Sequence, residues 1–380
     1  MLAIGLMSGT SLDGVDTVLC EISGSIDQVS VKQVDFMTLP FEMGVKDRIR
    51  KVIQGENIQT QLICSLNFEL GHVFSKAVKM MLDKHGLKGR DVRFVANHGQ
   101  TFYHLPKAKP PYVPSTLQMG ESAIIAYDHH IDVIDDFRVM DLAAKGEGAP
   151  LVPFSEMLLY RRSGEVVALQ NIGGISNVTL LGDDFIQAFD CGPGNMMIDE
   201  AMRHFFDSPY DANGRCAASA DRDEVLFAEL IKHPYLDRKP PKSTGREDFG
   251  EAFVMDIIQR YPSLSAAQIV STFTSFTAYC IADSIQRFAR HFPISMVVGG
   301  GGAYNKELLR RIQVDLPDVD VKTQEDVGFS SEAKEAIAFV ILGYAFLNRV
   351  PANVPATTGA QHLVILGKLT PNPFTDSLYL

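Results

Sequence analysis

The chain has 380 residues, of which 46% are hydrophobic. This length exceeds what one ordinary core buries, and it predicts two domains with an active cleft between them. The 35 basic and 46 acidic residues give a net charge of −11 without any basic block. Such a balance argues against a nucleic-acid partner and favours a small molecule.

The N-terminal stretch is apolar but lacks a positively charged region, and it runs directly into polar residues 8–13. We therefore expect neither a signal peptide nor a membrane span, and a cytoplasmic protein. The cysteines are scattered, odd in number and without a Cys-x-x-Cys pair, which argues against a disulfide framework and against structural zinc. They are Cys20, Cys64, Cys191, Cys216 and Cys280.

The first half of the chain alternates short apolar runs with helical patterns. Residues 2–7 and 15–22 flank a polar, glycine-bounded turn and predict a β-hairpin. Apolar residues recur every three or four positions over 62–81, which predicts a long helix. Buried strands are expected at 93–97 and 132–135.

The second half has the same character with new elements. Strands are predicted at 166–171, 178–181, 185–189 and 295–298, and helices at 196–206, 266–290 and 305–312. Hairpins, crossover helices and glycine turns together indicate an α/β protein built on two sheets. We place the first lobe at residues 1–131, completed by the C-terminal segment 351–380, and the second lobe at 132–350.

The turn between Gly9 and Gly14 superficially matches a Walker phosphate loop. However, Val15 and Asp16 stand where that loop requires Lys and Ser or Thr, and a strand follows where a helix is required. The Walker interpretation therefore fails. Taken alone, the segment is also explained as a simple turn.

A tight hairpin turn can instead point backbone N–H groups at an anion, with the hydroxyls of Thr10 and Ser11 as additional donors. No lysine neutralises the phosphates there, so Asp13 is expected to hold Mg²⁺, directly or through water. We predict that the nucleotide contacts the whole segment: Gly9, Thr10, Ser11, Leu12, Asp13, Gly14, Val15 and Asp16.

Two later glycine turns suggest further nucleotide contacts. Gly173 and Gly174 lie between two predicted strands, where the lack of Cβ lets the backbone approach a second phosphate. Gly300 and Gly301 belong to a run of four glycines between a strand and a helix, and they are expected to flank adenine or ribose.

The same glycine run partly satisfies the Rossmann pattern of dinucleotide-binding proteins. Asp318 or Asp320 would then be the acid that binds the ribose about 20 residues further on. A nicotinamide-dependent oxidoreductase therefore stays an alternative at this point.

The chain resembles the anhydro-N-acetylmuramic acid kinases in a series of motifs that occur in the same order and span nearly its whole length. They are MSGTSLDGVD at 7–16, NHGQT at 97–101, NIGGISN at 171–177, FDCGPGN at 189–195 and GGGGAYN at 299–305. The family usually has threonine where this chain has Cys191. The resemblance implies a two-lobed, actin-like ATPase of ribonuclease H-like fold, with ATP and Mg²⁺ in the interlobe cleft, and it suggests a homodimer.

The resemblance also implies a reaction. Family members hydrolyse the 1,6-anhydro bridge of the amino sugar while its O6 takes the γ-phosphate of ATP. This chemistry needs a base that activates water, and Asp190, at the end of a predicted strand, is our candidate; an Asx turn is its structural alternative. Glu335 aligns with a family acid, and surface pairing along a helix is its alternative.

Polar residues after the strand at 93–97 are expected to bind the sugar: Asn97, His98, Gln100 and Thr101. His98 is expected to bind and not to catalyse, although a buried structural histidine is equally common. Arg138 could bind the lactyl carboxylate in bidentate fashion, with Asp135 beside it, or form a local Asp–Arg pair. Asn177 is the last predicted sugar contact.

Other functions on the same fold remain open from the sequence. An actin-like filament protein would bind nucleotide without a sugar site, and the fold alone does not decide between them. A hydrolase of phosphate chains should carry a basic groove, and no such stripe is evident in this acidic chain.

Overall fold

The structure is a computed structural model that describes residues 1–9, 12–55 and 58–374. The chain divides into two compact units, Met1–Leu159 with Glu332–Leu380, and Tyr160–Ser331. Each unit is described by itself. The division thus falls after residue 159 and before residue 332, and not at the predicted 131 and 351. The reason is that strand β6 (Val133–Asp135) pairs with strand β4 (Val92–Leu105) of the first sheet, and helix α13 (Lys334–Leu347) packs on that sheet.

The first unit is built on a mixed sheet in the order β12-β6-β4-β1-β2-β3, with β5 paired to β4. Strands β1, β4 and β6 are parallel, whereas β2 and β3 continue from β1 as antiparallel neighbours. The remaining strands are β1 (Leu2–Ser8), β2 (Gly14–Ser23), β3 (Ser30–Pro40), β5 (Ser115–Met119) and β12 (Lys368–Thr370).

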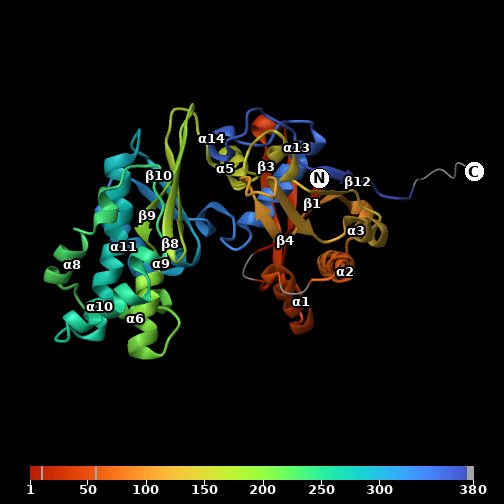
Figure 1. Cartoon of the computed structure of the whole chain (residues 1–380). Helices are drawn as coiled ribbons and strands as arrows, with labels where there is room; N and C mark the ends of the chain where they lie inside the picture. Colours follow the sequence, from red (N-terminus) through yellow and green to blue (C-terminus); the bar gives the residue numbers. More distant parts are fainter. Residues whose placement is uncertain (10–11, 56–57, 375–380) are drawn as a thin grey trace, which may run out of the picture. The chain divides into compact units, whose positions relative to one another are not determined.

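The helices of this unit are α1 (Met43–Gln54), α2 (Thr60–Lys84), α3 (Ser122–His129), α4 (Val139–Ala143), α5 (Val152–Tyr160), α13 and α14 (Pro355–Thr358), with 3-10 turns at Ile26–Gln28 and Gly89–Asp91. Helix α13 is apolar on all sides, which is typical of a buried helix, and it lies against β1 and β4 (Figure 1). Gly5 permits this approach, because a Cβ there would lie 2.2 Å from the Ala336 carbonyl oxygen.

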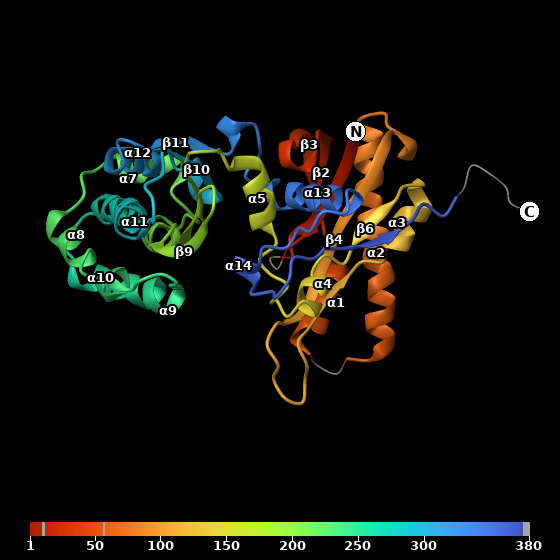
Figure 2. The same ribbon diagram turned by 90° about the horizontal axis from the view of Figure 1, so that it is seen from above.

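The second unit is built on a sheet in the order β11-β10-β7-β8-β9. Its strands are β7 (Val167–Ile172), β8 (Ile175–Leu181), β9 (Ile186–Pro193), β10 (Ser295–Gly299) and β11 (Asp320–Thr323). Its helices are α6 (Met196–Phe206), α7 (Arg215–Ala218), α8 (Glu224–Leu230), α9 (Arg246–Phe249), α10 (Glu251–Arg260), α11 (Ala266–Phe288) and α12 (Lys306–Asp315), with 3-10 turns at Ala212–Gly214, Pro234–Asp237, Gly301–Tyr304 and Glu325–Val327. Helix α11 packs on β9, and Figure 2 shows it nearly end-on beside that strand.

The two units share one strand topology. In each unit the first three strands form an antiparallel meander. On its other side the first strand pairs with a later parallel strand, and that strand pairs with a further parallel strand. This order is that of the ribonuclease H-like fold, so the predicted fold class is confirmed. It also places the turn after β1 and the turn after β7 at equivalent positions. Among the helices of the described residues, none is long and apolar enough to cross a membrane.

Candidate active site

The first glycine hairpin joins β1 to β2 and is tied to the rest of its sheet. Thr10 and Ser11, the predicted hydroxyl donors, lie outside the described residues. Leu12 is buried at a φ of 58°, a left-handed conformation that marks a tight turn. A Cβ on Gly14 would lie 2.2 Å from the carbonyl oxygen of Leu39, so only glycine lets β3 pack here.

Acidic side chains gather near this hairpin. The carboxylate of Asp13 is mostly exposed and lies 3.8 Å from Lys46 Nζ. Asp16 is half-buried and accepts a hydrogen bond of 2.6 Å from Thr38 Oγ1. Burial raises the pKa of Asp16, and the negative charges of Glu332 and Asp13 add to that rise. Because like charges oppose one another here, a bound cation would stabilise the arrangement.

Gln100 and Ser8 fix the hairpin through buried hydrogen bonds. The Gln100 side chain is fully buried, and its amide nitrogen donates to the carbonyl oxygen of Gly9 at 3.3 Å. Ser8 Oγ lies 2.6 Å from the amide oxygen of Gln100 and 2.9 Å from the carbonyl oxygen of Gly14. Gln100, predicted to bind the sugar, therefore supports the turn that carries the predicted phosphate contacts. Val15 is likewise buried, in β2.

The side chain of Asn97 likewise makes its hydrogen bonds within the fold. Its amide nitrogen donates to the Gly120 carbonyl at 3.1 Å and to Ser122 Oγ at 3.2 Å, and its oxygen accepts from the Gly99 N–H at 3.0 Å. With 1% of its surface exposed, the side chain is fixed within β4 (Val92–Leu105). Asn97 was predicted to follow a buried strand and bind the sugar, but the strand continues past it to Leu105.

His98 and Arg138 form the polar centre of the first unit. His98 Nδ1 lies 2.8 Å from the Gly99 carbonyl oxygen, and Arg138 Nε donates to His98 Nε2 at 3.0 Å. Burial, aided by the charge of Arg138, lowers the pKa of His98 to about 3. The imidazole is therefore neutral, with its proton on Nδ1, and Phe339 packs on it at a ring-centroid distance of 4.6 Å.

A cavity of about 490 Å³ opens beside this pair. It is lined by Met7, Ser8, Gly9, His98, Thr101, His104, Arg138, Ala149 and Glu335. The structure thus brings together the hairpin and the predicted sugar contacts His98, Thr101 and Arg138. Glu335 lies exposed at the start of α13; displacement of water by the surrounding protein raises its pKa, and Lys334 and Arg138 oppose that shift.

Asp135 does not join this cavity. Its half-buried carboxylate is hydrogen-bonded to Ser122, and burial raises its pKa to about 6. Asp136 pairs with Lys368. Among the described residues, the hydrogen bonds of Arg138 go to His98 and to the Gly148 carbonyl oxygen at 2.8 Å. The local Asp–Arg pair that the sequence left open is therefore wrong, since Arg138 turns towards the cavity.

In the second unit the Gly173-Gly174 turn is open on one side. The carbonyls of these glycines accept backbone hydrogen bonds from the segment that begins α6, including Asn195 N to Gly173 O at 2.8 Å. A Cβ on either glycine would have no protein atom closer than 3.5 Å. Packing within the unit thus gives no reason for glycine at these two positions, whereas close approach of a ligand does.

Asp190, the predicted base, lies in β9 and is held from several sides. Thr244 N donates to its Oδ2 at 3.0 Å, Tyr235 Oη donates to its carbonyl oxygen at 2.7 Å, and its own N–H donates to the Lys242 carbonyl at 3.1 Å. Burial raises the pKa of Asp190, while the Thr244 hydrogen bond and the charge of Lys242 lower it. Asn177 is its cross-strand partner in β8.

The glycine run after β10 borders a second cavity, of about 450 Å³. Its lining residues are Asn195, Ile198, Asp199, Tyr210, Asp211, Ala212, Asn213, Gly301, Tyr304 and Asn305. Gly301, predicted to flank adenine or ribose, therefore borders this cavity. Gly300 has a φ of 80°, and a Cβ there would lie 2.7 Å from Asn171 Oδ1, so glycine is required for the turn itself.

Several residues that line this cavity were not predicted from the sequence. Tyr210 and Tyr304 are about half exposed and offer aromatic surface, and burial raises the pKa of Asp199 to about 6. Tyr304 belongs to the GGGGAYN motif, so this motif could have indicated it as a site residue. Tyr210 and Asp199 carry no pattern that distinguishes them from other surface residues.

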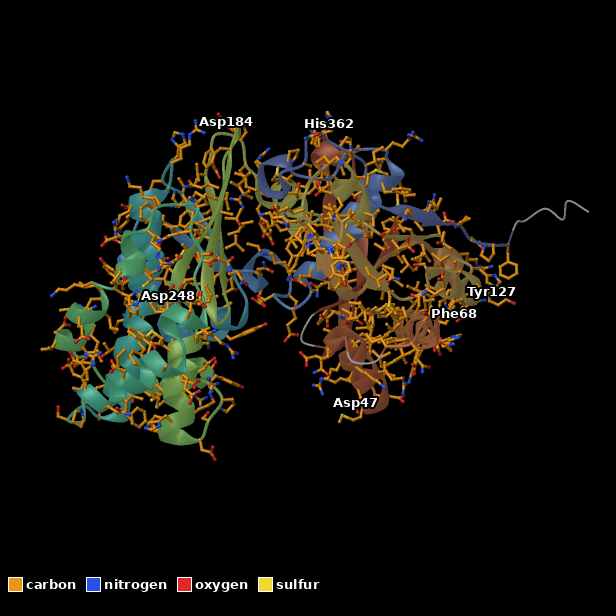
Figure 3. All side chains as sticks on the ribbon, in the orientation of Figure 1. Asp47, Phe68, Tyr127, Asp184, Asp248 and His362 are labelled. Atoms are coloured by element: carbon orange, nitrogen blue, oxygen red, sulfur yellow. The ribbon has the colours of Figure 1, made fainter. Side chains whose placement is uncertain are left out.

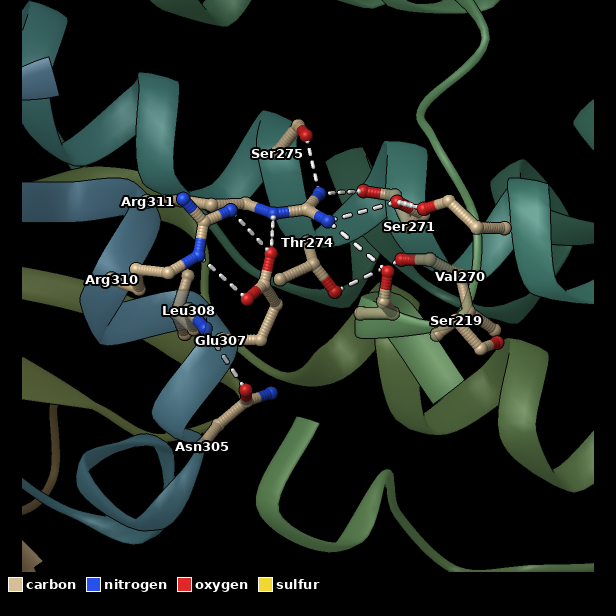
Figure 4. A network of polar contacts seen from close by, with 12 residues as sticks. Ser219, Val270, Ser271, Thr274, Ser275, Asn305, Glu307, Leu308, Arg310 and Arg311 are labelled. Atoms are coloured by element: carbon tan, nitrogen blue, oxygen red, sulfur yellow. Dashed lines mark hydrogen bonds and ion pairs between the residues drawn. The ribbon is translucent and has the colours of Figure 1, made fainter. Parts of the chain in front are cut away.

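Arg311 secures the helix that borders this cavity (Figure 4). Asn305 caps α12 by accepting from Leu308 N at 3.0 Å, and Glu307 in the first turn binds Arg311 at 2.7 Å. The Arg311 guanidinium then donates to the Ser271 carbonyl and to Ser275 Oγ on α11. This network fixes the start of α12, and with it the cavity wall, to the core helix of the unit.

Comparison with known proteins identifies the family of this chain. The family model described as anhydro-N-acetylmuramic acid kinase matches residues 1–372. The chain belongs to the anhydro-N-acetylmuramic acid kinase family. This confirms the resemblance drawn from the motifs. The matched region includes both glycine turns, Asp190 and the two cavities.

Two members of the family illustrate the similarity, each sharing almost half of its residues with this chain. A protein named anhydro-N-acetylmuramic acid kinase from Clostridioides difficile (strain 630) is 47% identical over 380 residues, covering 98% of this chain and 99% of the relative. One from Bacillus cereus (strain Q1) is 46% identical over 378 residues, covering 97% and 99%. Among solved structures, the activator of the 2-hydroxyisocaproyl-CoA dehydratase from Clostridium difficile with bound ADPNP has a TM-score of 0.44 at 13% identity, covering 92% of this chain and 95% of that one.

Proposed function

We propose that this protein is an ATP-dependent kinase that hydrolytically opens 1,6-anhydro-N-acetylmuramic acid and phosphorylates O6, giving N-acetylmuramic acid 6-phosphate. The observation that carries the proposal is the family match over residues 1–372. Asp190, predicted to end a strand, instead lies within β9 (Ile186–Pro193), where hydrogen bonds hold it, and each unit carries a cavity. A water molecule adds to C1, the bond between C1 and O6 breaks, and O6 forms the new bond to the γ-phosphorus while ADP leaves.

Asp190 is the proposed general base. Its Oδ2 is oriented by the Thr244 N–H, and its raised pKa makes the carboxylate a stronger proton acceptor than an exposed aspartate. The carboxylate takes a proton from the attacking water. O6 needs no separate acid, because its developing negative charge passes to the phosphoryl group that it receives.

The glycine turns are the proposed nucleotide contacts. The turn after β1 and the Gly173-Gly174 turn would approach phosphates through their backbone, and the open space at Gly173 and Gly174 supports this. The cavity bordered by Gly301 and Tyr304 would take the adenosine, with aromatic surface available for stacking.

Mg²⁺ is proposed as the metal, since it supplies the positive charge that neutralises the phosphates during transfer. Asp13 would hold it, directly or through water. A cation there would also lower the raised pKa of the neighbouring Asp16. No cluster of three or more metal-ligating side chains occurs within the described residues. This fits Mg²⁺, which usually takes one or two protein carboxylates together with phosphate oxygens and waters.

The cavity of the first unit is the proposed sugar subsite. Arg138 would bind the lactyl carboxylate, and His98 and Thr101 would contact the sugar beside it. Glu335, at the rim of this cavity, would assist as an acid. Asn97, Gln100 and Asp135 would support the subsite through the contacts described above, and Asn177 would contact the sugar from β8.

Two further properties are proposed from the family membership. We propose a homodimer, and we propose that the enzyme works in the cytoplasm, where ATP is supplied. Sedimentation at micromolar concentration tests the first property, and a single monomeric species would contradict it. Fractionation of cells followed by activity measurement tests the second.

The decisive experiment supplies ATP, Mg²⁺ and 1,6-anhydro-N-acetylmuramic acid and determines product mass. The proposal requires a gain of one water and one phosphoryl group together. A gain of the phosphoryl group alone would indicate an ordinary sugar kinase. ADP formation that does not depend on the sugar would indicate a nucleotide switch, and it would overturn the proposal.

A further inference from the structure

Asp141 is an acidic residue of α4 to which the proposed function assigns no role. Its side chain is fully buried. Burying a carboxylate is unfavourable unless hydrogen bonds replace its lost hydration. Both oxygens of Asp141 accept such bonds, one from the loop that follows α4 and the other from the C-terminal segment that carries Asn353 and Thr358. The carboxylate thus joins two segments that are far apart in the chain.

The C-terminal segment binds one oxygen of this carboxylate. Asn353 Nδ2 and Thr358 Oγ1 each donate to Asp141 Oδ1 at 2.9 Å. Both side chains are buried. Asn353 is fixed further, because its amide nitrogen donates to the carbonyl of His362, labelled in Figure 3, and its oxygen accepts from Val364 N at 2.8 Å. The position of Oδ1 is therefore set from outside the loop.

Gly148 binds the other oxygen. The Gly148 N–H donates to Asp141 Oδ2 at 2.8 Å, and Gly148 has a φ of 68°, a conformation that favours glycine. A Cβ on Gly146 would lie 2.2 Å from the same oxygen, so glycine there leaves room for the carboxylate. Glu147 N also donates to the Thr358 carbonyl at 2.7 Å. Loss of the Asp141 bond would therefore loosen Gly148 without releasing the whole loop.

Gly148 in turn holds the guanidinium of Arg138. Its carbonyl oxygen accepts from Arg138 Nη1 at 2.8 Å, while Arg138 Nε donates to His98 Nε2 at 3.0 Å. Two of the three guanidinium nitrogens are thus fixed by the protein. Among the described residues Nη2 has no hydrogen-bond partner, and Arg138 lines the cavity of the first unit. This nitrogen is left for a carboxylate of the ligand.

We propose that Asp141 is a positioning residue for Arg138: through the Gly148 N–H it fixes the glycine whose carbonyl orients the guanidinium towards the lactyl carboxylate of the sugar. This inference rests on the proposed function, in which Arg138 binds that carboxylate. A guanidinium that is already held at two nitrogens loses less conformational freedom when it binds a ligand than a free one does.

The competing explanation is a purely structural role, in which Asp141 only attaches the C-terminal segment. Asp141→Asn separates the two explanations, because an amide has one acceptor oxygen where the carboxylate has two. That oxygen is expected to stay with the two donors Asn353 and Thr358. The NH2 group then faces the Gly148 N–H, and this hydrogen bond is lost while the C-terminal segment stays attached.

The test is a double-mutant cycle of Asp141→Asn and Arg138→Met, with kcat and KM measured for 1,6-anhydro-N-acetylmuramic acid and for ATP. In Asp141→Asn we expect KM for the sugar to rise by about 3- to 10-fold, since the guanidinium loses part of its support. KM for ATP and kcat should be nearly unchanged. When Arg138 is already methionine, Asp141→Asn should raise KM for the sugar no further.

NMR of the Arg138 Nε–H reports the position of the guanidinium without any substrate. This N–H donates to His98, so it should exchange slowly with water in the wild type. In Asp141→Asn its exchange should be at least about threefold faster.

Thr358→Val serves where Asp141→Asn does not fold. It keeps the carboxylate and removes one donor to Oδ1, so KM for the sugar should rise by about 2- to 3-fold. Thr357→Val is the matched control, because the Thr357 hydroxyl donates to the Val354 carbonyl of the same turn. It should match the wild type.

An unchanged KM for the sugar in folded Asp141→Asn, or in Thr358→Val where the asparagine variant does not fold, overturns the positioning role. A full additional rise when Arg138 is methionine, or an equal rise of KM for both substrates, overturns it as well. Failure of the proposed function is a different result: the wild type would then form no product that gains both water and a phosphoryl group. The exchange rate of the Arg138 N–H would still decide whether Asp141 holds the guanidinium.

Discussion

The two units share a strand order, but the cavities that they carry are lined by different kinds of residue. In the first unit, residues of β4 together with Arg138 and the start of α13 line a cavity that contains the charged Arg138 and the neutral His98. In the second unit, residues that follow β9 and residues that follow β10 together line a cavity that contains glycine backbone, tyrosine rings and amides. The same strand order thus carries two cavities with different linings, which shows that the topology fixes where each cavity lies and the local residues decide its chemistry.

The largest effect is expected from Asp190→Asn. The substitution keeps the size of the side chain and its contact with Thr244 but removes the proton acceptor, so turnover should fall by about 10³-fold or more while both ligands still bind. Product formation and calorimetric titration measure the two quantities.

The matched control for that variant is Asp184→Asn, in the exposed turn between β8 and β9 (Figure 3). It should leave turnover unchanged. Near-normal turnover in Asp190→Asn would refute the assignment of Asp190 as the base.

Arg138→Met tests the cavity of the first unit. Loss of the guanidinium should raise KM for the sugar by about 10- to 100-fold, since a charge-assisted contact to a carboxylate contributes on the order of 1.5–3 kcal/mol. KM for ATP should change little. Arg90→Met, on an exposed turn of the same unit, is the control, and an equal effect of Arg138→Met on both substrates would argue against a separate sugar subsite.

Glycine substitutions sharpen the contrast between packing and ligand approach in the second unit. A Cβ on Gly194 would lie 2.3 Å from the Gly173 carbonyl, so Gly194→Ala should lower the free energy of unfolding by about 1–3 kcal/mol. Gly174→Ala has room and should keep stability within about 0.5 kcal/mol while raising KM for ATP. Denaturant unfolding and kinetics check both variants, and an unchanged KM in Gly174→Ala would argue against a phosphate at that turn.

The smallest expected effect is on stability at acid pH. The pKa of His98 falls from its usual 6.5 to about 3 in the folded protein, so between these values the unfolded chain binds a proton that the folded chain does not. Stability from this group is therefore complete above pH 6.5 and declines as pH falls towards 3. His98→Gln should make the free energy of unfolding less dependent on pH in this window, and an unaltered slope would contradict the buried neutral imidazole.

Periodicity and glycine spacing were sufficient to predict the main elements near the sites. The helices predicted at 62–81 and 266–290 correspond to α2 and α11, and the hairpin at residues 2–22 corresponds to β1 and β2. These signals are local, because an apolar stripe or a tight turn is written in neighbouring residues. The boundary between the units was misplaced, because β6 and α13 join the first sheet through contacts between residues far apart in the chain.

The sequence by itself determined the family, the ribonuclease H-like fold and the motifs that carry the candidate site, since each of these depends on residue types in a fixed order. Only the tertiary structure decided that Gln100 and Asn97 support the backbone, that Arg138 binds His98 in place of an aspartate, and that the Thr244 N–H orients the carboxylate of Asp190. Partners of a side chain depend on which strands and helices meet in space, and that information is absent from the order of residues along the chain.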